Sequence, residues 1–262
     1  LGSANVDAHS SSCNLSKEGA YQLTIGATGY ANDFANAKMV MFIGRSYGDG
    51  IRPSSVQSLA DAAEHGTRVV IVDPRLNNSG IFASDWVPIN PGTDLALLMA
   101  MANVLIEEDL YDHDFVEQNT YGFEEFAEQA KEYTPEWAEK ITDVPAETIQ
   151  ELARSMAKAA PAASIESGWR SVIGCSYKNS FETARAITAI NSLLGCWGAK
   201  GGALITSSPK AGAIEDARFK APAKPAAKRI GDAEYPLVLA SAGTNVAALQ
   251  ATLEGEIKGL FF

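Results

Sequence analysis

Three short apolar runs, each followed by polar or glycine-rich residues, mark the first third of the chain. They cover residues 38–44 (KMVMFIG), 69–72 (VVIV) and 86–89 (WVPI). Consecutive apolar positions over this length are typical of strands that are buried on both faces, as in parallel sheets. Between the first two runs, Pro53 fits a first helical position, and Gly66 fits a left-handed cap that ends the helix. The pattern therefore predicts a strand–helix–strand unit.

Helical spacing dominates the next hundred residues. Residues 94–108 are apolar almost all round, which predicts a helix that is covered by neighbours on several sides. Further helices are predicted at 112–117, 123–131, 134–141, 145–159 and 181–194, and one more strand is predicted at 163–166. Strands that alternate with helices in this way predict the α/β class, with an open, mostly parallel sheet flanked by helices.

The last fifth of the chain has a different composition. Residues 208–236 are poor in large apolar side chains and rich in Lys, Ala and Pro, which predicts a surface connection. Apolar runs at 237–240 and 257–262, around a helical stretch, predict the start of a second small α/β unit. Because the chain opens without Met and stops in a strand-like run, we expect a fragment of a longer protein.

Composition excludes several classes of protein. The net charge of −11 disfavours a nucleic-acid or anionic-membrane surface, because either partner would meet a net negative field. No apolar run is long enough to predict a transmembrane helix. Three widely spaced cysteines predict neither a disulfide framework nor a tetrahedral zinc site.

Charged residues follow the predicted strands. Asp73 and Arg75 follow the second strand, Asp94 follows the third, and the first is followed by a loop at 44–50 (GRSYGDG). In open α/β sheets ligands bind outside the carboxyl ends of the strands, so these residues should meet in one crevice. Carboxylates there accept from ribose hydroxyls or the N–H edge of guanine, and glycine lets the backbone approach a phosphate. A nucleotide site is one hypothesis; helix or turn caps with Arg75 as their partner are the other.

Two further residues are candidates for chemistry. Cys13 lies in a polar, small-residue stretch (HSSSCNLS), which fits a nucleophile, a single thiolate ligand or a loop cysteine without a role. Arg170, after Gly168 and Trp169, fits either an anion contact or stacking on the tryptophan at the surface.

Several stretches in one order carry a family resemblance. They are NAKMVMFIGRSYGDG, VVIVDPR, SDWVPINPGTDLALLMAMANVLIEEDLYDHDFV, YTPEWAEKITDVPAETIQELAR and LLGCWGAKGG. Together they resemble the catalytic subunit of the molybdopterin oxidoreductases of the dimethyl sulfoxide reductase type, from about Asn5 to Ile205. The resemblance implies a bis(molybdopterin guanine dinucleotide) cofactor whose molybdenum, or tungsten, is held by four dithiolene sulfurs and one protein ligand.

The resemblance also assigns residues. The place of the protein ligand in the family falls on Cys13, and a soft thiolate suits a sulfur-rich metal site. Asp73 and Asp94 would hold ribose or guanine, Arg75 and the amides of residues 44–48 would lie near the phosphates, and Gly92 would allow close approach. The full set of implied cofactor-binding residues is Gly44, Arg45, Ser46, Gly48, Asp73, Arg75, Gly92, Asp94, Gly168 and Trp169.

The closest branch by motif is the polysulfide and thiosulfate reductases. His9-x-Ser11-x-Cys13 and SGWRS at 167–171 resemble that branch, whereas Ser12 and Asn14 depart from formate dehydrogenases. The implied activity is two-electron reduction of an inorganic sulfur compound, with Arg170 orienting an anionic substrate. The alternatives are a family member acting on arsenate, tetrathionate, formate or a catechol, a nicotinamide-dependent dehydrogenase, and a non-catalytic nucleotide-binding module.

The resemblance implies a domain plan and partners. Residues 1–8 would be a fringe of the second domain, 9–207 the Rossmann-like third domain that binds one guanine dinucleotide, 208–236 a surface connection, and 237–262 the truncated start of a second cofactor-binding unit. The full-length protein would carry a 4Fe–4S cluster, pair with an iron–sulfur electron-transfer subunit and a membrane anchor subunit, and be exported for anaerobic respiration in a bacterium. The segment alone is expected to fold without catalysing, with Cys13 exposed near a frayed start.

Overall fold

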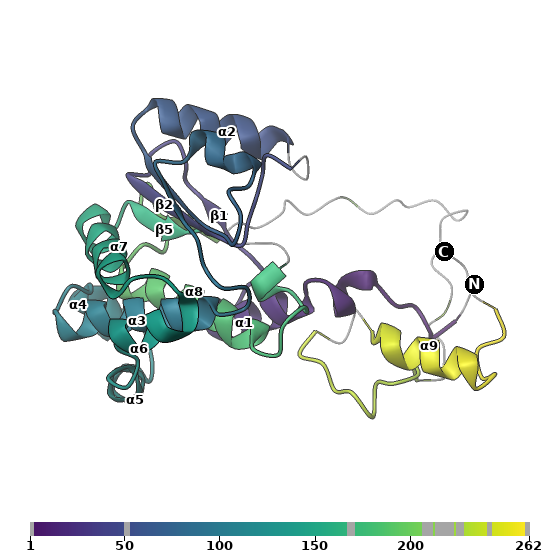
Figure 1. Ribbon diagram of the computed structural model, residues 1–262. Coiled ribbons are helices and arrows are strands. Elements are labelled where there is room, and N and C mark those ends of the chain that lie inside the picture. Colours follow the sequence, from purple (N-terminus) through teal and green to yellow (C-terminus); the bar gives the residue numbers. More distant parts are fainter. Residues whose placement is uncertain are drawn as a thin grey trace.

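A four-stranded parallel sheet with helices on both faces forms the centre of the protein (Figure 1). The computed structural model describes residues 3–49, 53–166, 171–205, 212, 223, 228–239 and 243–259. The strands lie in the order β4-β3-β2-β5, and every neighbouring pair is parallel. Their bounds are β2 (Met39–Ile43), β3 (Arg68–Val72), β4 (Asp85–Val87) and β5 (Ala163–Ile165). The predicted α/β class and the predicted open parallel sheet are confirmed.

Both faces of the sheet are buried, as the unbroken apolar runs predicted. Val40 and Phe42 of β2 point to the face that is covered by α2 (Pro53–Glu64), where they pack with Leu59. Met39 and Met41 point to the other face and join the larger core. Burying a side chain of this size contributes about 1.5–3 kcal/mol.

Three long helices cover that second face. They are α3 (Asp94–Glu107), α7 (Ala146–Ala159) and α8 (Ser180–Leu193). Of these, α3 contacts α5, α6, α7 and α8 at once, which explains why its apolar residues are not confined to one stripe. In Figure 1, α2 lies above the sheet and this helical layer lies below it.

Local capping sets the ends of the shorter helices. The bounds are α4 (His113–Asn119), α5 (Phe123–Ala130) and α6 (Pro135–Thr142). The Asp112 carboxylate accepts from the amide of Phe115 at the start of α4, and Thr134 caps α6, whose first residue is Pro135. All predicted helices of this region form within two residues of their predicted ends.

Several elements were not predicted. The helix α1 (Leu15–Ile25) packs on α8, and β1 (Ala31–Asn32) pairs antiparallel with β6 (Ala203–Leu204). Three short 3-10 helices also occur, at η1 (His9–Ser12), η2 (Asn78–Phe82) and η3 (Ser171–Ile173).

Strands were predicted at 237–240 and 257–262, of which residue 240 and residues 260–262 lie outside the described residues; the described residues 237–239 and 257–259 form no strand. Val238 and Leu239 lie in a turn, residues 257–259 are irregular, and the regular element of this part is α9 (Asn245–Leu253). An extended segment without a partner strand is not stable, and no partner strand is present within 228–239 or 243–259. The predicted surface connection at 208–236 lies largely outside the described residues.

Residues shortly before α1 contact the start of α9. The amide of Asn245 donates to Ser11 Oγ over 3.2 Å, and the amide of Thr244 donates to Asp7 Oδ1 over 3.2 Å. The stretch before α1 therefore packs against the segment around α9, away from the sheet (Figure 1). None of the helices in the described part of the chain is both long and apolar enough to cross a membrane.

Candidate functional site

A cavity of about 440 Å³ opens at the carboxyl ends of β2, β3 and β4. It is lined by Gly44, Arg45, Ser46, Asp49, Asp73, Pro74, Arg75, Pro91, Gly92, Asp94, Val172 and Tyr177. Because parallel strands end at one edge of a sheet, loops that are far apart in sequence meet here. Seven of the ten residues that the sequence analysis assigned to a cofactor lie in this lining, and those are Gly44, Arg45, Ser46, Asp73, Arg75, Gly92 and Asp94.

Asp94 is a buried carboxylate at the first position of α3. Only 2% of the residue is exposed, and burial raises the pKa of Asp94 to about 6, with the nearby Asp73 carboxylate adding to the shift. The backbone amide of Asp94 opposes the shift. Within the described residues, its side chain accepts from no other protein donor. A ligand that brings N–H or O–H donors into the cavity would therefore satisfy this carboxylate.

Asp73 both shapes the turn after β3 and lines the cavity. Its Oδ1 accepts from the amide of Arg75 over 3.0 Å, and its Oδ2 accepts from Asn77 Nδ2 over 3.0 Å. Asp73 is thus a turn cap, as one of the two hypotheses predicted, and it also lines the cavity. Trp86 Nε1 donates to the Asp73 carbonyl over 2.9 Å and joins this turn to β4.

Arg75 forms an exposed ion pair at the rim. Its Nη2 lies 2.7 Å from Asp49 Oδ2, and the Arg75 side chain is 65% exposed. The Ser46 hydroxyl, followed by the Arg75 guanidinium, holds the pKa of Asp49 below its usual value. Asp49 was not assigned from the sequence, although it belongs to the loop after the first strand.

A buried ionic network lies at the ends of β2 and β5. Arg45 Nε lies 3.6 Å from Glu166 Oε2, and Tyr47 donates its hydroxyl to Glu166 Oε1 over 2.6 Å. The Arg45 guanidinium also lies 4.8 Å from the centre of the Tyr47 ring. Burial raises the pKa of Tyr47, and the Glu166 carboxylate adds to the shift, so this phenol stays a donor at ordinary pH. Glu166 thereby compensates the charge of an arginine that lines the cavity.

Several backbone amides of the loop after β2 have hydrogen-bond partners inside the protein. The amides of Tyr47 and Gly48 donate to Ser79 Oγ over 2.7 and 3.0 Å, and the Gly44 amide donates to the Val72 carbonyl. These three amides donate inside the protein, and the assignment of residues 44–48 to the phosphates stays a prediction. Gly48 is not among the residues that line the cavity, and a Cβ there would lie 2.6 Å from the carbonyl carbon of Asn78. The absence of a side chain at Gly48 lets this loop pack closely against η2.

The absence of a side chain at Gly92 lets the ring of Tyr177 lie close to the backbone at this position. Its φ is +80°, and a Cβ at this position would lie 2.6 Å from Cε1 of Tyr177. Tyr177 and Val172 both line the cavity and come from the segment 171–179. Sequence analysis missed both, because no local pattern places that segment beside β4.

Cys13 ends η1 and is half-buried, which corrects the expectation of an exposed thiol at a frayed start. Its carbonyl accepts from the amide of Cys175 over 3.2 Å, and Cys175 lies in the same segment as Val172 and Tyr177. No group of three or more His, Cys, Asp or Glu side chains is arranged to hold a metal within the described residues.

Three predicted site residues, Gly168, Trp169 and Arg170, lie outside the described residues.

The cavity holds more negative than positive charge. Asp49, Asp73 and Asp94 face Arg75 and Arg45, and the charge of Arg45 is compensated by Glu166. A cavity with more carboxylates than positively charged side chains favours the part of a ligand that carries hydrogen-bond donors. The N–H edge of guanine and the ribose hydroxyls are such parts. An exposed arginine at the rim is the remaining group suited to an anionic part of the same ligand.

Comparisons with known proteins identify relatives of this chain. A family model described as molybdopterin oxidoreductase matches residues 1–259. The molybdopterin-containing subunit of thiosulfate reductase from Salmonella typhimurium is 38% identical over 195 residues, which are 74% of this chain and 25% of that protein. The molybdopterin-containing subunit of arsenate respiratory reductase from a Shewanella species is 35% identical over 229 residues, 77% of this chain and 26% of that protein.

A solved structure has the same fold. Acetylene hydratase from Pelobacter acetylenicus matches with a TM-score of 0.68 and 30% identity, over 78% of this chain and 27% of that one. The chain spans about a quarter of the length of the curated relatives that it matches.

Proposed function

This chain belongs to the molybdopterin oxidoreductase family, and on that premise we propose that it forms the guanine-dinucleotide-binding α/β part of a molybdenum oxidoreductase catalytic subunit. Membership implies a molybdenum–molybdopterin cofactor. We assign residues 9–207 to the unit that binds one guanosine arm of this cofactor. Residues 1–8 and 237–262 would belong to neighbouring parts of the cofactor-binding structure, joined through 208–236.

The observation that carries the proposal is the buried carboxylate of Asp94, beside Asp73, in the strand-end cavity. A carboxylate can accept from both N1–H and N2–H of guanine, and these donors would satisfy the buried carboxylate of Asp94. Asp73 would accept from ribose, and Arg75 at the rim would meet the diphosphate. The residues present therefore fit the guanosine end of the cofactor.

Nucleotide selectivity tests this proposal. We expect GDP to bind the chain and IDP, which lacks the N2 amine, to bind about 10–100-fold more weakly, because a charge-assisted hydrogen bond contributes about 1.5–3 kcal/mol. ADP should bind at least as weakly as IDP, because its base presents an acceptor at N1. Isothermal titration with the three diphosphates measures the order. Equal affinity for GDP and ADP would contradict a guanine site, and tight NADH binding would favour a nicotinamide dehydrogenase.

We further propose Cys13 as the protein ligand of molybdenum. The bound cofactor supplies two-electron chemistry at the metal, while this chain supplies the thiolate, the guanosine contacts and the orientation of the substrate. The half-buried position of Cys13, held to the segment that carries Tyr177, supports a fixed ligand near the cavity.

Replacing Cys13 by Ala in the complete enzyme should remove one sulfur neighbour from molybdenum and abolish turnover. X-ray absorption at the molybdenum edge measures the number of sulfur ligands directly. Cys175→Ser is the matched control, because Cys175 is also half-buried and lies beside Cys13. If Cys13→Ala leaves the sulfur count unchanged, Cys13 is not the ligand.

For the substrate we propose an inorganic sulfur compound of the polysulfide or thiosulfate type. The 38% identity to a thiosulfate reductase subunit and the pattern from His9 to Cys13 support it. Relatives named for arsenate respiration and acetylene hydration have 35% and 33% identity, so an assay must compare thiosulfate, polysulfide, arsenate and acetylene. We propose Arg170 as the group that orients an anionic substrate. A 4Fe–4S cluster, an iron–sulfur subunit, a membrane anchor and export are proposed for the full-length protein.

A further inference from the structure

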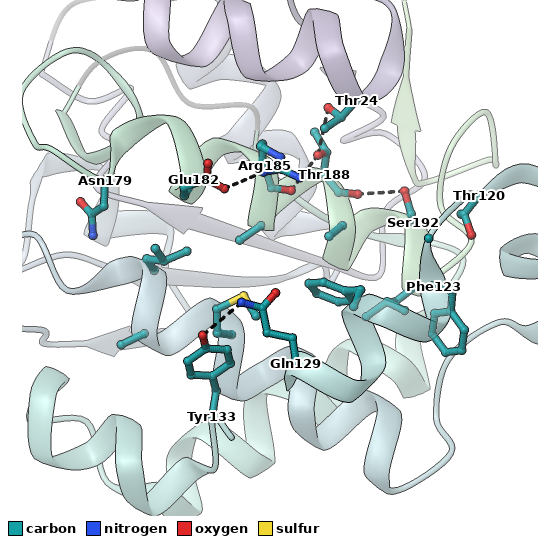
Figure 2. A pocket seen from close by; sticks show the side chains of 18 of the residues that line it. Thr24, Thr120, Phe123, Gln129, Tyr133, Asn179, Glu182, Arg185, Thr188 and Ser192 are labelled. Atoms are coloured by element: carbon teal, nitrogen blue, oxygen red, sulfur yellow. Dashed lines mark hydrogen bonds and ion pairs between the residues drawn. The ribbon is translucent and has the colours of Figure 1, made fainter. Parts of the chain in front are cut away.

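A second, larger hollow of about 1100 Å³ lies on the helical layer of the protein. One wall comes from α3, α5, α6 and the connection between α5 and α6, and it carries Met99, Phe123, Phe126, Tyr133 and Trp137. Figure 2 shows Phe123 and Tyr133 on this wall, across the hollow from α8. We call this hollow the helical groove. This wall is apolar, and the groove adjoins the strand-end cavity at Gly92, which lines both.

The opposite edge of the helical groove is polar and runs along α8. Glu182, Arg185, Thr188 and Ser192 recur every three or four residues, so they share one side of the helix (Figure 2). Arg185 Nη1 lies 2.9 Å from Glu182 Oε2, so the two charges offset each other. Thr188 Oγ1 donates to Thr24 Oγ1 over 3.1 Å. This edge therefore contributes little net charge.

The elements on the apolar side carry most of the negative charge of the chain. Residues 112–143, which contain α4, α5 and α6, hold ten acidic and two basic residues, a net −8 of the total −11. Glu128 pairs with Lys131. In the described part of the chain, no basic partner lies against six exposed carboxylates, which are Glu117, Glu124, Glu125, Glu132, Glu136 and Glu139.

We propose that the helical groove docks a basic amphipathic helix of a protein partner. The apolar face of such a helix would cover the aromatic wall, and its lysines and arginines would meet the acidic surface around that wall. A second copy of this chain would bring the same net −8 face against itself. An anionic membrane or a nucleic acid would be repelled for the same reason. The volume of the helical groove, about 1100 Å³, is slightly larger than the roughly 300–1,000 Å³ that is typical of binding sites for drug-sized molecules.

A designed peptide tests the docking. The probe is a fluorescein-labelled helix of about 18 residues with Leu at i, i+3, i+4 and i+7 and Lys elsewhere. We expect its fluorescence anisotropy to rise with added chain, and the affinity to fall about tenfold or more when salt is raised from about 50 to about 300 mM. A peptide with Glu in place of Lys, and a peptide of the same composition in scrambled order, should each bind at least about tenfold more weakly. Equal binding of either control peptide would overturn the proposal.

Variants of the chain locate the binding surface. Ala189 lines the groove and is half-buried, so Ala189→Phe fills the floor, while Tyr121→Ser removes a fully exposed ring from the edge without touching the core. Each variant should lower the affinity for the basic peptide, by about tenfold for Ala189→Phe and about threefold for Tyr121→Ser. Urea unfolding checks that each variant keeps the wild-type midpoint. If Ala189→Phe does not fold, Tyr121→Ser decides the matter alone.

Two double variants with the same change in net charge distinguish an effect of the acidic surface from an effect of net charge alone. Glu125→Lys with Glu132→Lys reverses two exposed charges that are next in sequence to the lining residues Phe126 and Tyr133. Asp61→Lys with Glu64→Lys reverses two exposed charges on α2, across the sheet (Figure 1). The first pair should cost about tenfold or more in affinity and the second less than about twofold. Equal losses, or a concentration-dependent dimer that Ala189→Phe abolishes, would overturn the proposal.

Discussion

Replacing Asp94 by Asn is expected to stabilise the protein at pH 8 and to weaken its binding of a guanine nucleotide. The two effects have one cause. Asp94 is a carboxylate whose burial raises its pKa to about 6, from an ordinary value of 3.8. Ionising it in the folded protein at pH 8 costs about 3 kcal/mol relative to the unfolded chain, and an amide does not incur that cost.

The pH dependence of this effect has a definite sign. Between pH 4 and pH 6 the folded state holds the Asp94 proton while the unfolded chain has largely lost it. The folded state therefore binds more protons, and wild-type stability falls as the pH rises through this window. The gain from Asp94→Asn should be about 2–3 kcal/mol at pH 8 and should shrink below about 1 kcal/mol at pH 4.

Urea unfolding at the two pH values measures the stability change, and titration with GDP measures the binding change. The amide keeps one acceptor but presents its own N–H groups to guanine, so the affinity for GDP should fall about 10–100-fold. Asp114→Asn is the control, because Asp114 is an exposed acidic residue in the first turn of α4. It should lower stability by less than about 1 kcal/mol and leave GDP binding unchanged. A variant that loses both stability and affinity would contradict this account of Asp94.

Replacing Glu166 by Ala is expected to lower the free energy of unfolding by about 3–5 kcal/mol, because it removes the Glu166 carboxylate from the buried charge of Arg45. Arg45 is only 4% exposed and Glu166 only 3%. The same change removes the acceptor of the Tyr47 hydroxyl, which is 2.6 Å from Glu166 Oε1. Urea unfolding at pH 7 measures the loss.

A second variant distinguishes the charge from the lost volume. Glu166→Gln combined with Arg45→Met removes both charges, keeps an acceptor for Tyr47 and keeps most of the buried volume. This double variant should be more stable than Glu166→Ala, because replacing both members of a buried ion pair costs less than removing one. If the double variant is the less stable of the two, the ion pair itself stabilises the fold. Because Arg45 lines the cavity, the double variant should also bind GDP more weakly.

Much of the architecture is visible in the amino-acid sequence. The unbroken apolar runs at 38–44 and 69–72 predict strands that are covered on both faces, and α2 and α3 do cover them. The stretch at 94–108 predicts a helix with neighbours on several sides, which α3 has. Such patterns can be interpreted without a structure, because the period of side-chain burial depends only on local backbone geometry.

The helix α1 could not be predicted in this way. Its sequence, LSKEGAYQLTI, places Lys17 and Gly19 on buried positions, and no apolar stripe results. Lys17 is 8% exposed, and its ammonium lies 5.8 Å from the centre of the Tyr21 ring. Contact with α8, far away in sequence, explains the burial.

The sequence by itself determined which strand ends carry Asp73, Arg75 and Asp94, and hence that they meet, because parallel strands finish at a common edge. Only the tertiary structure decided that Asp94 is desolvated, that Glu166 compensates Arg45 across 121 positions of sequence, and that Tyr177 lies against Gly92. It also decided that Gly48 serves packing and that Cys13 is half-buried. Burial and pairing depend on every segment that packs around a group, and no local pattern contains that information.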